Sequence, residues 1–253
     1  MSPKLSDPHS ISFSPILLTI VTVTKNCAAT LGKTLYSVKA IKSFDVEYIV
    51  VDGGSTDGSL EVIAGYSGLV DRMVTEPDTG IYNAMNKGVA LAQGRYVLFI
   101  NGDDELVADG FPLILKTLRD RSPEVLCATT LVGSVSQPDE VLVAKPWLLP
   151  FFNSIPHPSS FVSRPLLMVN PFREDLKIAS DYDFFLRAFL SRRRFLIVHA
   201  ITALHQRGGA SGNNQRSIEE VRKVRIERLG MGYPFANALA GTYRFIKKLV
   251  VSS

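Results

Sequence analysis

The chain has 253 residues and a net charge of +4, and 46% of its residues are hydrophobic. This length and ordinary apolar content are enough to bury a full core in one large α/β domain or two small ones. The two cysteines, Cys27 and Cys127, lie outside any CxxC or metal-ligand spacing. We therefore expect reduced, buried cysteines in the cytosol, which excludes a fold built on disulfides or on cysteine-bound metal.

We expect no signal peptide at the N-terminus. Residues 1–15 are polar and rich in serine and proline, which predicts a disordered lead. The first apolar run, 16–23, is too short to cross a bilayer. These features predict a cytoplasmic protein and leave open a peripheral position on the inner face of the cytoplasmic membrane.

Strands and helices alternate along the first hundred residues. Apolar runs rich in β-branched and aromatic residues predict strands over 16–23, 48–51, 70–75 and 96–100. Residues with helical spacing predict helices between these strands, the first with Thr30 as N-cap and the third, which begins at Tyr82, ending at Gly94. This order predicts an α/β fold with a single, mostly parallel, doubly wound sheet.

Three of these strands end in polar loops, over residues 22–26, 52–58 and 101–104. The carboxyl ends of parallel strands meet at one edge of a sheet, where ligands bind. Adjacent carboxylates such as Asp103 and Asp104 cost free energy unless a cation or hydrogen-bond donors offset them. Hard oxygen ligands of this type suit Mg²⁺ or Mn²⁺ that also holds a phosphate. The alternative interpretation is that each loop is an ordinary turn.

The glycine pattern excludes two classes of nucleotide-binding protein. No GxGxxG follows the first strand and no GxxxxGK[ST] occurs, which argues against a dehydrogenase-type dinucleotide fold and against a P-loop nucleotidase. The remaining mode of nucleotide binding is one in which side-chain carboxylates, loop amides and a metal ion hold the nucleotide.

Three segments carry a family resemblance. The run 50–58 resembles the second-strand motif of family 2 glycosyltransferases with the GT-A fold, 76–88 resembles the next motif of bacterial members that build polysaccharides, and 101–104 resembles the metal-binding DxD element. The nearest subgroup comprises transferases of colanic-acid, O-antigen and exopolysaccharide biosynthesis. The resemblance implies the GT-A (nucleotide-diphospho-sugar transferase) fold. It also implies inverting transfer of a sugar from a nucleoside diphosphate donor, expected to be UDP-linked, to a lipid-linked or oligosaccharide acceptor.

The resemblance implies nucleotide-binding roles for five side chains in the first half of the chain. Asp52 is expected to accept a hydrogen bond from N3–H of uracil, although guanine also presents an N–H. Thr22 and Thr24 are expected to line the base and ribose pocket, and Asp78 and Asn86 to lie near the ribose and phosphates. The alternatives are an Asx-type turn for Asp52 and helix capping for Asp78 and Asn86.

The DxD-like element implies a metal site. Asp103 is expected to bind both the metal and the nucleotide diphosphate. Asn101 stands where the family usually has the first aspartate, and an amide is a weaker oxygen ligand. We therefore expect Asp104 to help Asp103 hold Mg²⁺ or Mn²⁺, a Lewis acid for the departing diphosphate.

A candidate base lies in the second half of the chain. Ser180 and Asp181 resemble the ED motif that opens a helix in this family, which implies that Asp181 is the catalytic base. The alternative is that Asp181 only caps the helix predicted over 182–190, and Asp183 is a reserve base.

Two further residues are implied in substrate binding. His157 resembles an acceptor-binding position, although Pro158 replaces the usual glutamine and a structural histidine is the alternative. Arg207 lies in a glycine-rich segment that resembles the donor loop of this group, where its guanidinium is expected to contact the diphosphate.

The end of the chain is basic. From residue 192 onward there are twelve lysines and arginines and three glutamates. We expect basic amphipathic helices over 213–253, for which the charge alone allows nucleic acid, a phosphorylated ligand or an anionic membrane surface as partner, or simply a solvated or packed face. The resemblance favours the membrane surface and a polyprenyl-diphosphate-linked acceptor, with no nucleic acid.

These expectations define a domain organisation and leave alternatives open. We expect a catalytic domain over 16–212, with a nucleotide-binding half over 16–105 and an acceptor half over 106–212. A nucleotidyltransferase acting on a sugar phosphate and a non-catalytic nucleotide-sugar-binding protein remain the alternative functions.

Overall fold

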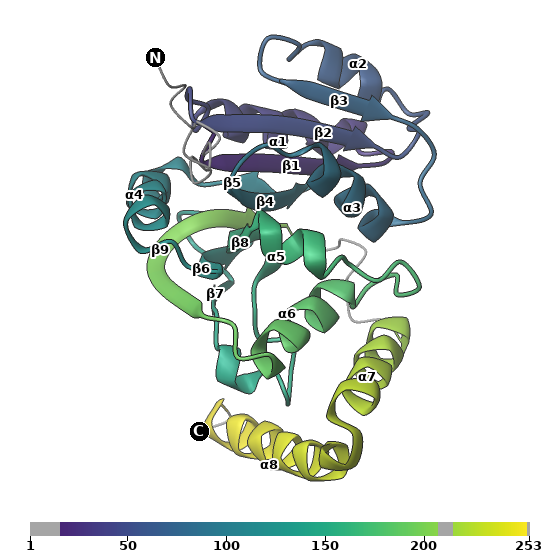
Figure 1. Ribbon diagram of the computed structural model, residues 1–253, viewed down its shortest axis with the longest axis vertical. Coiled ribbons are helices and arrows are strands. Elements are labelled where there is room, and N and C mark those ends of the chain that lie inside the picture. The colour runs from purple at the N-terminus through teal and green to yellow at the C-terminus, as the bar shows by residue number, and fades with distance from the viewer. Residues whose placement is uncertain (1–15, 207–214, 252–253) are drawn as a thin grey trace, which may run out of the picture.

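The computed structural model describes residues 16–206 and 215–251 and, in the last helix, side chains up to residue 242 (Figure 1). Within these residues the strands form one nine-stranded sheet with the order β3-β2-β1-β4-β8-β6-β9-β5, and β7 pairs with β6. The α/β class and the parallel first half of the sheet were predicted correctly.

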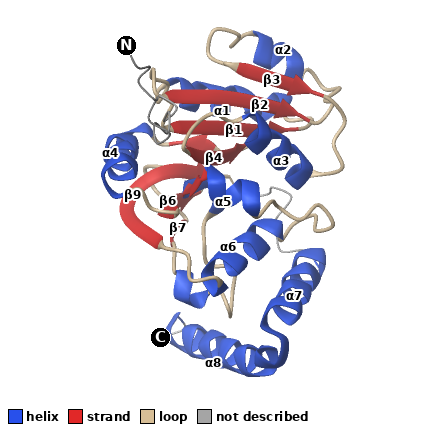
Figure 2. Cartoon of the chain, in the orientation of Figure 1, coloured by secondary structure: helices blue, strands red, loops and turns tan. Residues whose placement is uncertain are grey.

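The first half is a parallel sheet covered by helices on both faces (Figure 2). Its strands are β1 (Leu18–Thr24), β2 (Val46–Asp52), β3 (Arg72–Thr75) and β4 (Tyr96–Asn101), and its helices are α1 (Ala28–Lys39), α2 (Ser59–Ala64) and α3 (Ile81–Leu91). Every residue of β1 and β2 is buried, as expected of strands covered on both faces. All four strands point the same way, so their polar ends share one edge.

The second half continues the sheet with mixed strand directions. Its elements are β5 (Glu105–Leu106), η1 (Ala108–Gly110), α4 (Phe111–Arg121), β6 (Val125–Val132), β7 (Glu140–Val143), η2 (Pro146–Leu148), η3 (His157–Ser159), β8 (Ser160–Ser163), α5 (Arg164–Val169), α6 (Ser180–Leu190) and β9 (Phe195–His205). β8 runs antiparallel to both β4 and β6, whereas β9 runs parallel to β6. The strand β9 curls round the end of the sheet (Figure 1) and returns the chain to β5 beside the end of β4.

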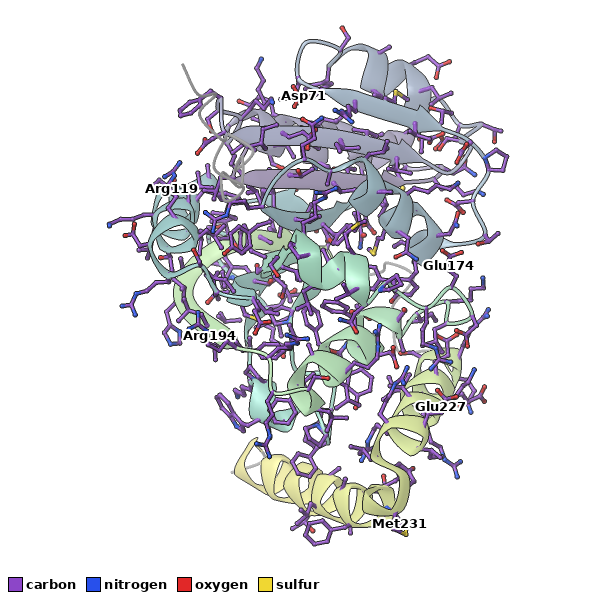
Figure 3. The ribbon with its side chains drawn as sticks, in the orientation of Figure 1. Asp71, Arg119, Glu174, Arg194, Glu227 and Met231 are labelled. Atoms are coloured by element: carbon purple, nitrogen blue, oxygen red, sulfur yellow. The ribbon has the colours of Figure 1, made fainter. Side chains whose placement is uncertain are left out.

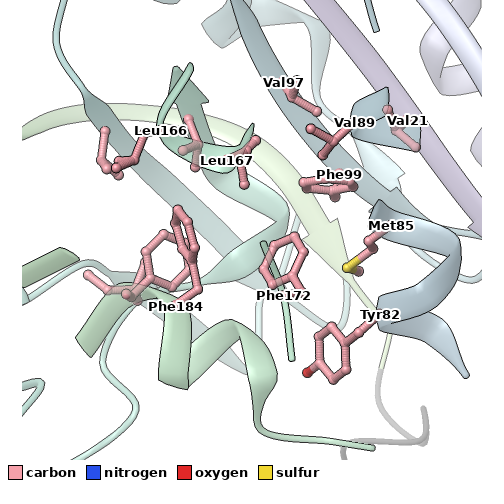
Figure 4. Close-up of a cluster of buried hydrophobic side chains, with 14 of the residues drawn as sticks. Val21, Tyr82, Met85, Val89, Val97, Phe99, Leu166, Leu167, Phe172 and Phe184 are labelled. Atoms are coloured by element: carbon pink, nitrogen blue, oxygen red, sulfur yellow. The ribbon is translucent and has the colours of Figure 1, made fainter. Parts of the chain in front are cut away.

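Two hydrophobic clusters cover the two faces of the sheet. The cluster near the candidate site joins α3 to α5 and α6 through Phe172, whose ring lies 5.5 Å from Phe99, 5.4 Å from Phe184 and 5.7 Å from Tyr82 (Figure 4). Burying aromatic side chains of this size stabilises a domain by about 1.5 to 3 kcal/mol each. The aromatic contacts therefore fix the start of α3 against α6.

The structure gives Thr30 and Gly94 roles that differ from the predicted N-cap and the predicted helix end. α1 begins at Ala28, so Thr30 lies inside its first turn rather than at the N-cap, and its hydroxyl donates to the carbonyl of Gly102 at 2.8 Å. Gly94 lies beyond the end of α3, and a Cβ there would lie 2.5 Å from the backbone nitrogen of Thr19. Close approach of two backbones is thus what requires glycine at this position.

Two helices, α7 (Gln215–Leu229) and α8 (Tyr233–Val251), follow the sheet, with η4 (Gly230–Gly232) between them. α7 packs against the helices that cover the sheet, because Val224 is fully buried in the same cluster as Phe184. Arg225 is also buried, and its guanidinium stacks on the ring of Tyr233 at 5.2 Å. In the part of the chain that the structure describes, none of the helices is both long enough and apolar enough to cross a bilayer.

Candidate functional site

A cavity of about 300 Å³ opens where the end of β4 meets the first turns of α3 and α6 and the loop before β8. Four of the predicted site residues line this cleft: Asp103, Asp104, His157 and Asp181. They come from three separate segments of the chain. The predicted metal site and the predicted base therefore share one cavity.

The acidic end of the cleft holds buried oxygen atoms without partners. Oδ1 of Asp104 accepts hydrogen bonds from Nδ1 of His205 at 2.7 Å and from the backbone N–H of Gln206 at 3.2 Å. Oδ2 of Asp104 and Oδ1 of Asn101 are buried and have no hydrogen-bond partner. Leaving such groups unsatisfied costs about 1 to 3 kcal/mol each, more for a charged oxygen. A cation or a donor group in the cleft would remove this cost.

The electrostatics of this end follow from the same contacts. Burial, together with the neighbouring Asp104 carboxylate, raises the pKa of Asp103 above its usual value. The hydrogen bond to Asp104 raises the pKa of His205, against the opposing effect of burial. The site thus concentrates negative charge, which favours a bound cation.

The residues at this end fit a divalent metal only in part. Carboxylate and amide oxygens are the ligands that Mg²⁺ and Mn²⁺ prefer. Among the described residues, however, no three His, Cys, Asp or Glu side chains lie close enough to hold a metal by themselves. Asp103, Asp104 and Asn101 would need further oxygen ligands from a bound substrate.

Asp181 is the second residue of α6, and its carboxylate faces Tyr82 of α3. The Tyr82 hydroxyl lies 3.0 Å from Oδ1 of Asp181 and 2.6 Å from the carbonyl oxygen of Ile178. Burial and the Asp181 charge raise the pKa of Tyr82 well above its usual value, so this hydroxyl stays protonated and donates. The arrangement holds one oxygen of a carboxylate that also lines the cleft.

Glu220 of α7 holds the segment before Asp181, and no motif or spacing predicted this contact. Its carboxylate accepts the backbone N–H groups of Lys177 at 3.0 Å, Ile178 at 2.8 Å and Ala179 at 3.1 Å. Burial raises the pKa of Glu220, but these hydrogen bonds and the one from Arg216 together lower it by more. The pKa therefore lies below its usual value. The first turn of α6 is therefore held by a residue more than forty positions away in sequence.

Asp183 does not have the environment of a base. Its fully buried carboxylate lies 2.8 Å from Nε of Arg187, 2.7 Å from Nε of Arg228 and 3.7 Å from Nη1 of Arg173. Three arginines occupy its oxygens and tie α7 to α6. The structure gives no support to the reserve role suggested for Asp183, because arginines engage its carboxylate and it is not among the residues that line the cleft.

His157 is the first residue of η3, and it lines the cleft together with Asp103, Asp104 and Asp181. Its ring stacks on Phe99, with centroids 6.0 Å apart, and its Nε2 is buried without a partner. Burial lowers its pKa, so the ring is neutral at pH 7. A neutral imidazole with a free nitrogen in the cavity fits an exchange of hydrogen bonds with a substrate hydroxyl.

Asp52 makes the turn contacts that the alternative interpretation predicted. Oδ2 accepts the N–H groups of Gly54 and Ser55, both at 3.0 Å, and Oδ1 accepts the Ser55 hydroxyl. The residue has no exposed surface. For Asp52 to accept a hydrogen bond from the N–H of a nucleotide base, this loop would have to open.

The loops after β1, β2 and β3 converge at Asp78, whereas the sequence predicts the loop after β4 as the third of the converging loops. A Cβ on Gly53 would lie 2.1 Å from Oδ2 of Asp78, and Nζ of Lys25 lies 3.9 Å from Oδ1 of the same residue. Asp78 is thus the carboxylate at which all three loops meet. Glycine at position 53 is what allows this approach.

The structure places Thr22 and Asn86 away from the cleft. The Thr22 hydroxyl lies 2.8 Å from that of Tyr48, and neither residue has exposed surface. Asn86 donates to the carbonyl of Phe172 and to Glu174 and accepts the N–H of Phe172, which joins α3 to the segment before α6, where Figure 3 shows Glu174. Both side chains have structural partners in place of a nucleotide.

The predictions for Thr24, Arg207 and the two cysteines remain. The Thr24 hydroxyl is buried without a partner, against the position of Gly102. Arg207 lies outside the described residues. Cys27 and Cys127 are both free thiols, although Cys27 is only half-buried.

Comparison with known proteins places this geometry in context. The family model described as glycosyl transferase family 2 matches residues 19–170. The chain is 28% identical over 230 residues to a PGL/p-HBAD biosynthesis glycosyltransferase of Mycobacterium bovis, covering 85% of this chain and 87% of that protein. It is 31% identical over 182 residues to chondroitin synthase of Pasteurella multocida, covering 68% of this chain and 18% of that protein.

Two solved structures share the fold. S. aureus TarS 1–349 in complex with UDP-GlcNAc superposes with a TM-score of 0.68 at 18% identity, covering 85% of this chain and 67% of that chain. Glucosyl-3-phosphoglycerate synthase from Mycobacterium tuberculosis, in complex with Mn²⁺, UDP and glucosyl-3-phosphoglycerate, superposes with a TM-score of 0.62 at 22% identity, covering 85% and 80%. The overlap shows that the GT-A fold was predicted correctly.

Proposed function

Because the chain belongs to glycosyl transferase family 2, we propose that it transfers a sugar, with inversion, from a UDP-sugar to a lipid-linked or oligosaccharide acceptor in cell-surface polysaccharide or glycolipid biosynthesis. One observation carries the proposal. The unpartnered oxygens of Asp104 and Asn101 and the carboxylate of Asp181 line the same cavity. A site for a diphosphate and a base for an acceptor hydroxyl are thus adjacent.

Asp181 is the proposed general base. An acceptor hydroxyl in the cleft gives its proton to the Asp181 carboxylate while its oxygen attacks C1 of the donor sugar. The bond from C1 to the diphosphate oxygen breaks on the opposite face, and its electron pair leaves with the diphosphate. Since Tyr82 holds Oδ1 of Asp181, we assign the proton to Oδ2.

Asp103 and Asp104, with Asn101, are the residues that we propose to hold Mg²⁺ or Mn²⁺ together with donor oxygens. When bound, the cation neutralises charge on the departing diphosphate. The glucosyl-3-phosphoglycerate synthase structure contains Mn²⁺ and UDP, which supports this choice by analogy of fold.

Donor and acceptor contacts complete the proposal. We assign the nucleotide to the loops that meet at Asp78, and the acceptor to the part of the cleft that His157 lines. The UDP complexes of TarS support a uracil base. The relatives named as a PGL/p-HBAD biosynthesis glycosyltransferase and as chondroitin synthase support a saccharide or lipid-linked acceptor.

An anionic membrane surface is the proposed partner of the C-terminal helices. Met231 of η4 and Phe235 of α8 have 99% and 71% of their surfaces exposed. Exposed apolar residues on a basic helix are typical of helices that lie on a bilayer. A membrane position suits an acceptor that is itself anchored in the bilayer.

The products of the reaction test the proposed function. The purified chain is incubated with a panel of UDP-sugars and saccharide acceptors, and UDP release is measured. We expect UDP release that depends on the acceptor and is lost in Asp181→Asn, which still binds UDP. Formation of pyrophosphate from UTP and a sugar phosphate would indicate a nucleotidyltransferase instead, and nucleotide-sugar binding with no turnover would indicate a binding protein.

A further inference from the structure

A surface groove near the carboxyl end of α6 combines apolar and basic side chains. Trp147 of η2, Phe189 and Leu190 of α6, and Phe195 of β9 line it together with Arg192 and Arg193. We call this set the tryptophan groove. It is separate from the catalytic cleft, with which it shares no lining residue.

Two apolar residues of the tryptophan groove are exposed, while Phe189 and Phe195 pack against the core. Trp147 has 59% of its surface exposed and Leu190 has 44%. Leaving a large aromatic side chain in water forgoes the free energy of burying it, about 1.5 to 3 kcal/mol. Tryptophan is enriched where one end of a side chain meets hydrocarbon and the other meets water.

The positive charge in and beside the groove indicates that its partner is an anionic surface. Residues 192–194 are three consecutive arginines, all exposed, and exposed Lys145 precedes the segment that carries Trp147. Glu124 pairs with Arg193 at 3.0 Å, so one carboxylate faces a run of three guanidinium groups. Clusters of basic residues beside exposed apolar ones are complementary to anionic lipid headgroups over a hydrocarbon layer.

The loop over residues 144–156 connects the tryptophan groove to the acceptor side of the cleft. Trp147 lies near its start, while Ile155 and Pro156 at its end line the cleft. The backbone N–H of Lys145 donates to the carbonyl of Ser154 at 3.0 Å and closes the loop. A surface bound through Trp147 would thus lie beside the acceptor side of the cleft.

The same end of the molecule carries α8. Nε of Arg225 donates to the carbonyl of Pro150 at 3.2 Å, and its guanidinium stacks on Tyr233 at the start of α8. Figure 3 shows Arg194 and Met231 in the half of the molecule away from β1, β2 and β3. The groove and the exposed residues of α8 are therefore joined through one loop.

We propose that the tryptophan groove is a membrane-binding surface that contacts an anionic bilayer through Trp147 and Leu190 and through the arginines that flank them. This adds a second contact to the C-terminal helices and places the acceptor side of the cleft toward the bilayer. This proposal rests on the proposed function at one point only, namely that the acceptor is held in the membrane.

The single tryptophan of the chain allows a direct test, because its fluorescence reports the tryptophan groove alone. Full-length protein is mixed with vesicles of phosphatidylglycerol and phosphatidylcholine, or of phosphatidylcholine only, without donor or acceptor. We expect a blue shift of the emission, and quenching by lipids brominated in the acyl chain, with the anionic vesicles only. Co-sedimentation without any change in emission would overturn the proposal, as would an equal shift with neutral vesicles or no binding at all.

Matched variants distinguish binding through the groove from effects of net charge or hydrophobicity elsewhere on the surface. Arg192→Glu is expected to weaken vesicle binding roughly 25-fold, since each basic residue near an anionic surface contributes about a factor of five. Lys33→Glu, an exposed charge reversal on α1, should show no such loss. Leu190→Ser should weaken binding, and Phe44→Ser, at a residue with 91% of its surface exposed, should not.

A titration of each sample with UDP keeps this proposal distinct from the proposed function. Retained UDP binding with no vesicle binding would overturn only the membrane surface. An emission shift that follows protein concentration in the absence of vesicles would instead show self-association through the groove and would contradict the proposal.

Discussion

The hydroxyl of Tyr82 lies 3.0 Å from Oδ1 of Asp181, and this contact joins the first turn of α3 to the first turn of α6. Tyr82 belongs to the segment that follows β3, in the predicted nucleotide-binding half of the chain, whereas Asp181 belongs to the predicted acceptor half. The proposed base is therefore held by a residue from the donor side of the cleft.

Removing the Tyr82 hydroxyl tests this contact. Tyr82→Phe keeps the aromatic packing against Phe172 and deletes the donor to Asp181. A hydrogen bond to a charged group contributes about 1.5 to 3 kcal/mol, so we expect kcat to fall roughly tenfold with the KM for the donor unchanged. Steady-state kinetics check this, and an unchanged kcat would mean that Asp181 does not depend on Tyr82.

Replacing Asp181 tests the base itself. Asp181→Asn cannot accept a proton, and general-base catalysis contributes about 10² to 10⁴ in rate. We expect a loss of kcat in that range with UDP binding retained, measured by UDP release and calorimetry. Asp120→Asn, an exposed carboxylate on α4, serves as the control. Full activity in Asp181→Asn would contradict the assignment.

Asn101 offers a gain-of-function test of the metal site. Its Oδ1 is buried in the cleft without a partner, and a carboxylate is a stronger ligand than an amide. We expect Asn101→Asp to lower the Mn²⁺ concentration needed for half-maximal activity by roughly tenfold. If the requirement rises or stays the same, position 101 does not face the metal.

Glu220 links acid stability to the position of Asp181. Because the pKa of Glu220 lies below its ordinary value of 4.5 in the folded chain, the unfolded chain binds protons more readily. Its contribution to stability is therefore complete above about pH 4.5 and is lost as the pH falls through the lowered pKa. Urea unfolding should show Glu220→Gln less stable than the wild type at pH 7, with the difference shrinking as the pH falls below 4.5.

The same residue should affect catalysis without touching substrate. Glu220→Ala frees the N–H groups of Lys177 to Ala179, so we expect kcat to fall while UDP affinity is unchanged, and Glu220→Gln to recover part of the loss. Equal loss of kcat and UDP binding in both variants would indicate general unfolding instead.

The first half of the fold was predictable because its signals are local. Continuous apolar runs identify strands that are buried on both faces, and their parallel order places the loops after β1, β2 and β4 at one edge. The mixed pairing of β6, β8 and β9 was not predicted, because strand order there depends on contacts between distant segments.

The candidate site shows the same division. Asp103, Asp104, His157 and Asp181 lie together as expected, since short motifs at strand ends and helix starts identify them. Thr22 contacts Tyr48 and Asn86 contacts Phe172, partners that sequence spacing does not reveal. The role of Glu220 depends on where α7 packs, which follows from tertiary structure alone.

Calorimetric titration of UDP, with and without Mn²⁺, tests the central claim most directly. If the cleft holds a diphosphate between Asp103, Asp104 and a metal, UDP should bind, and Mn²⁺ should tighten that binding by about tenfold or more, equivalent to about 1.4 kcal/mol. GDP in a parallel titration should bind more weakly. Absence of UDP and GDP binding, or binding that is identical with and without metal, would contradict the account.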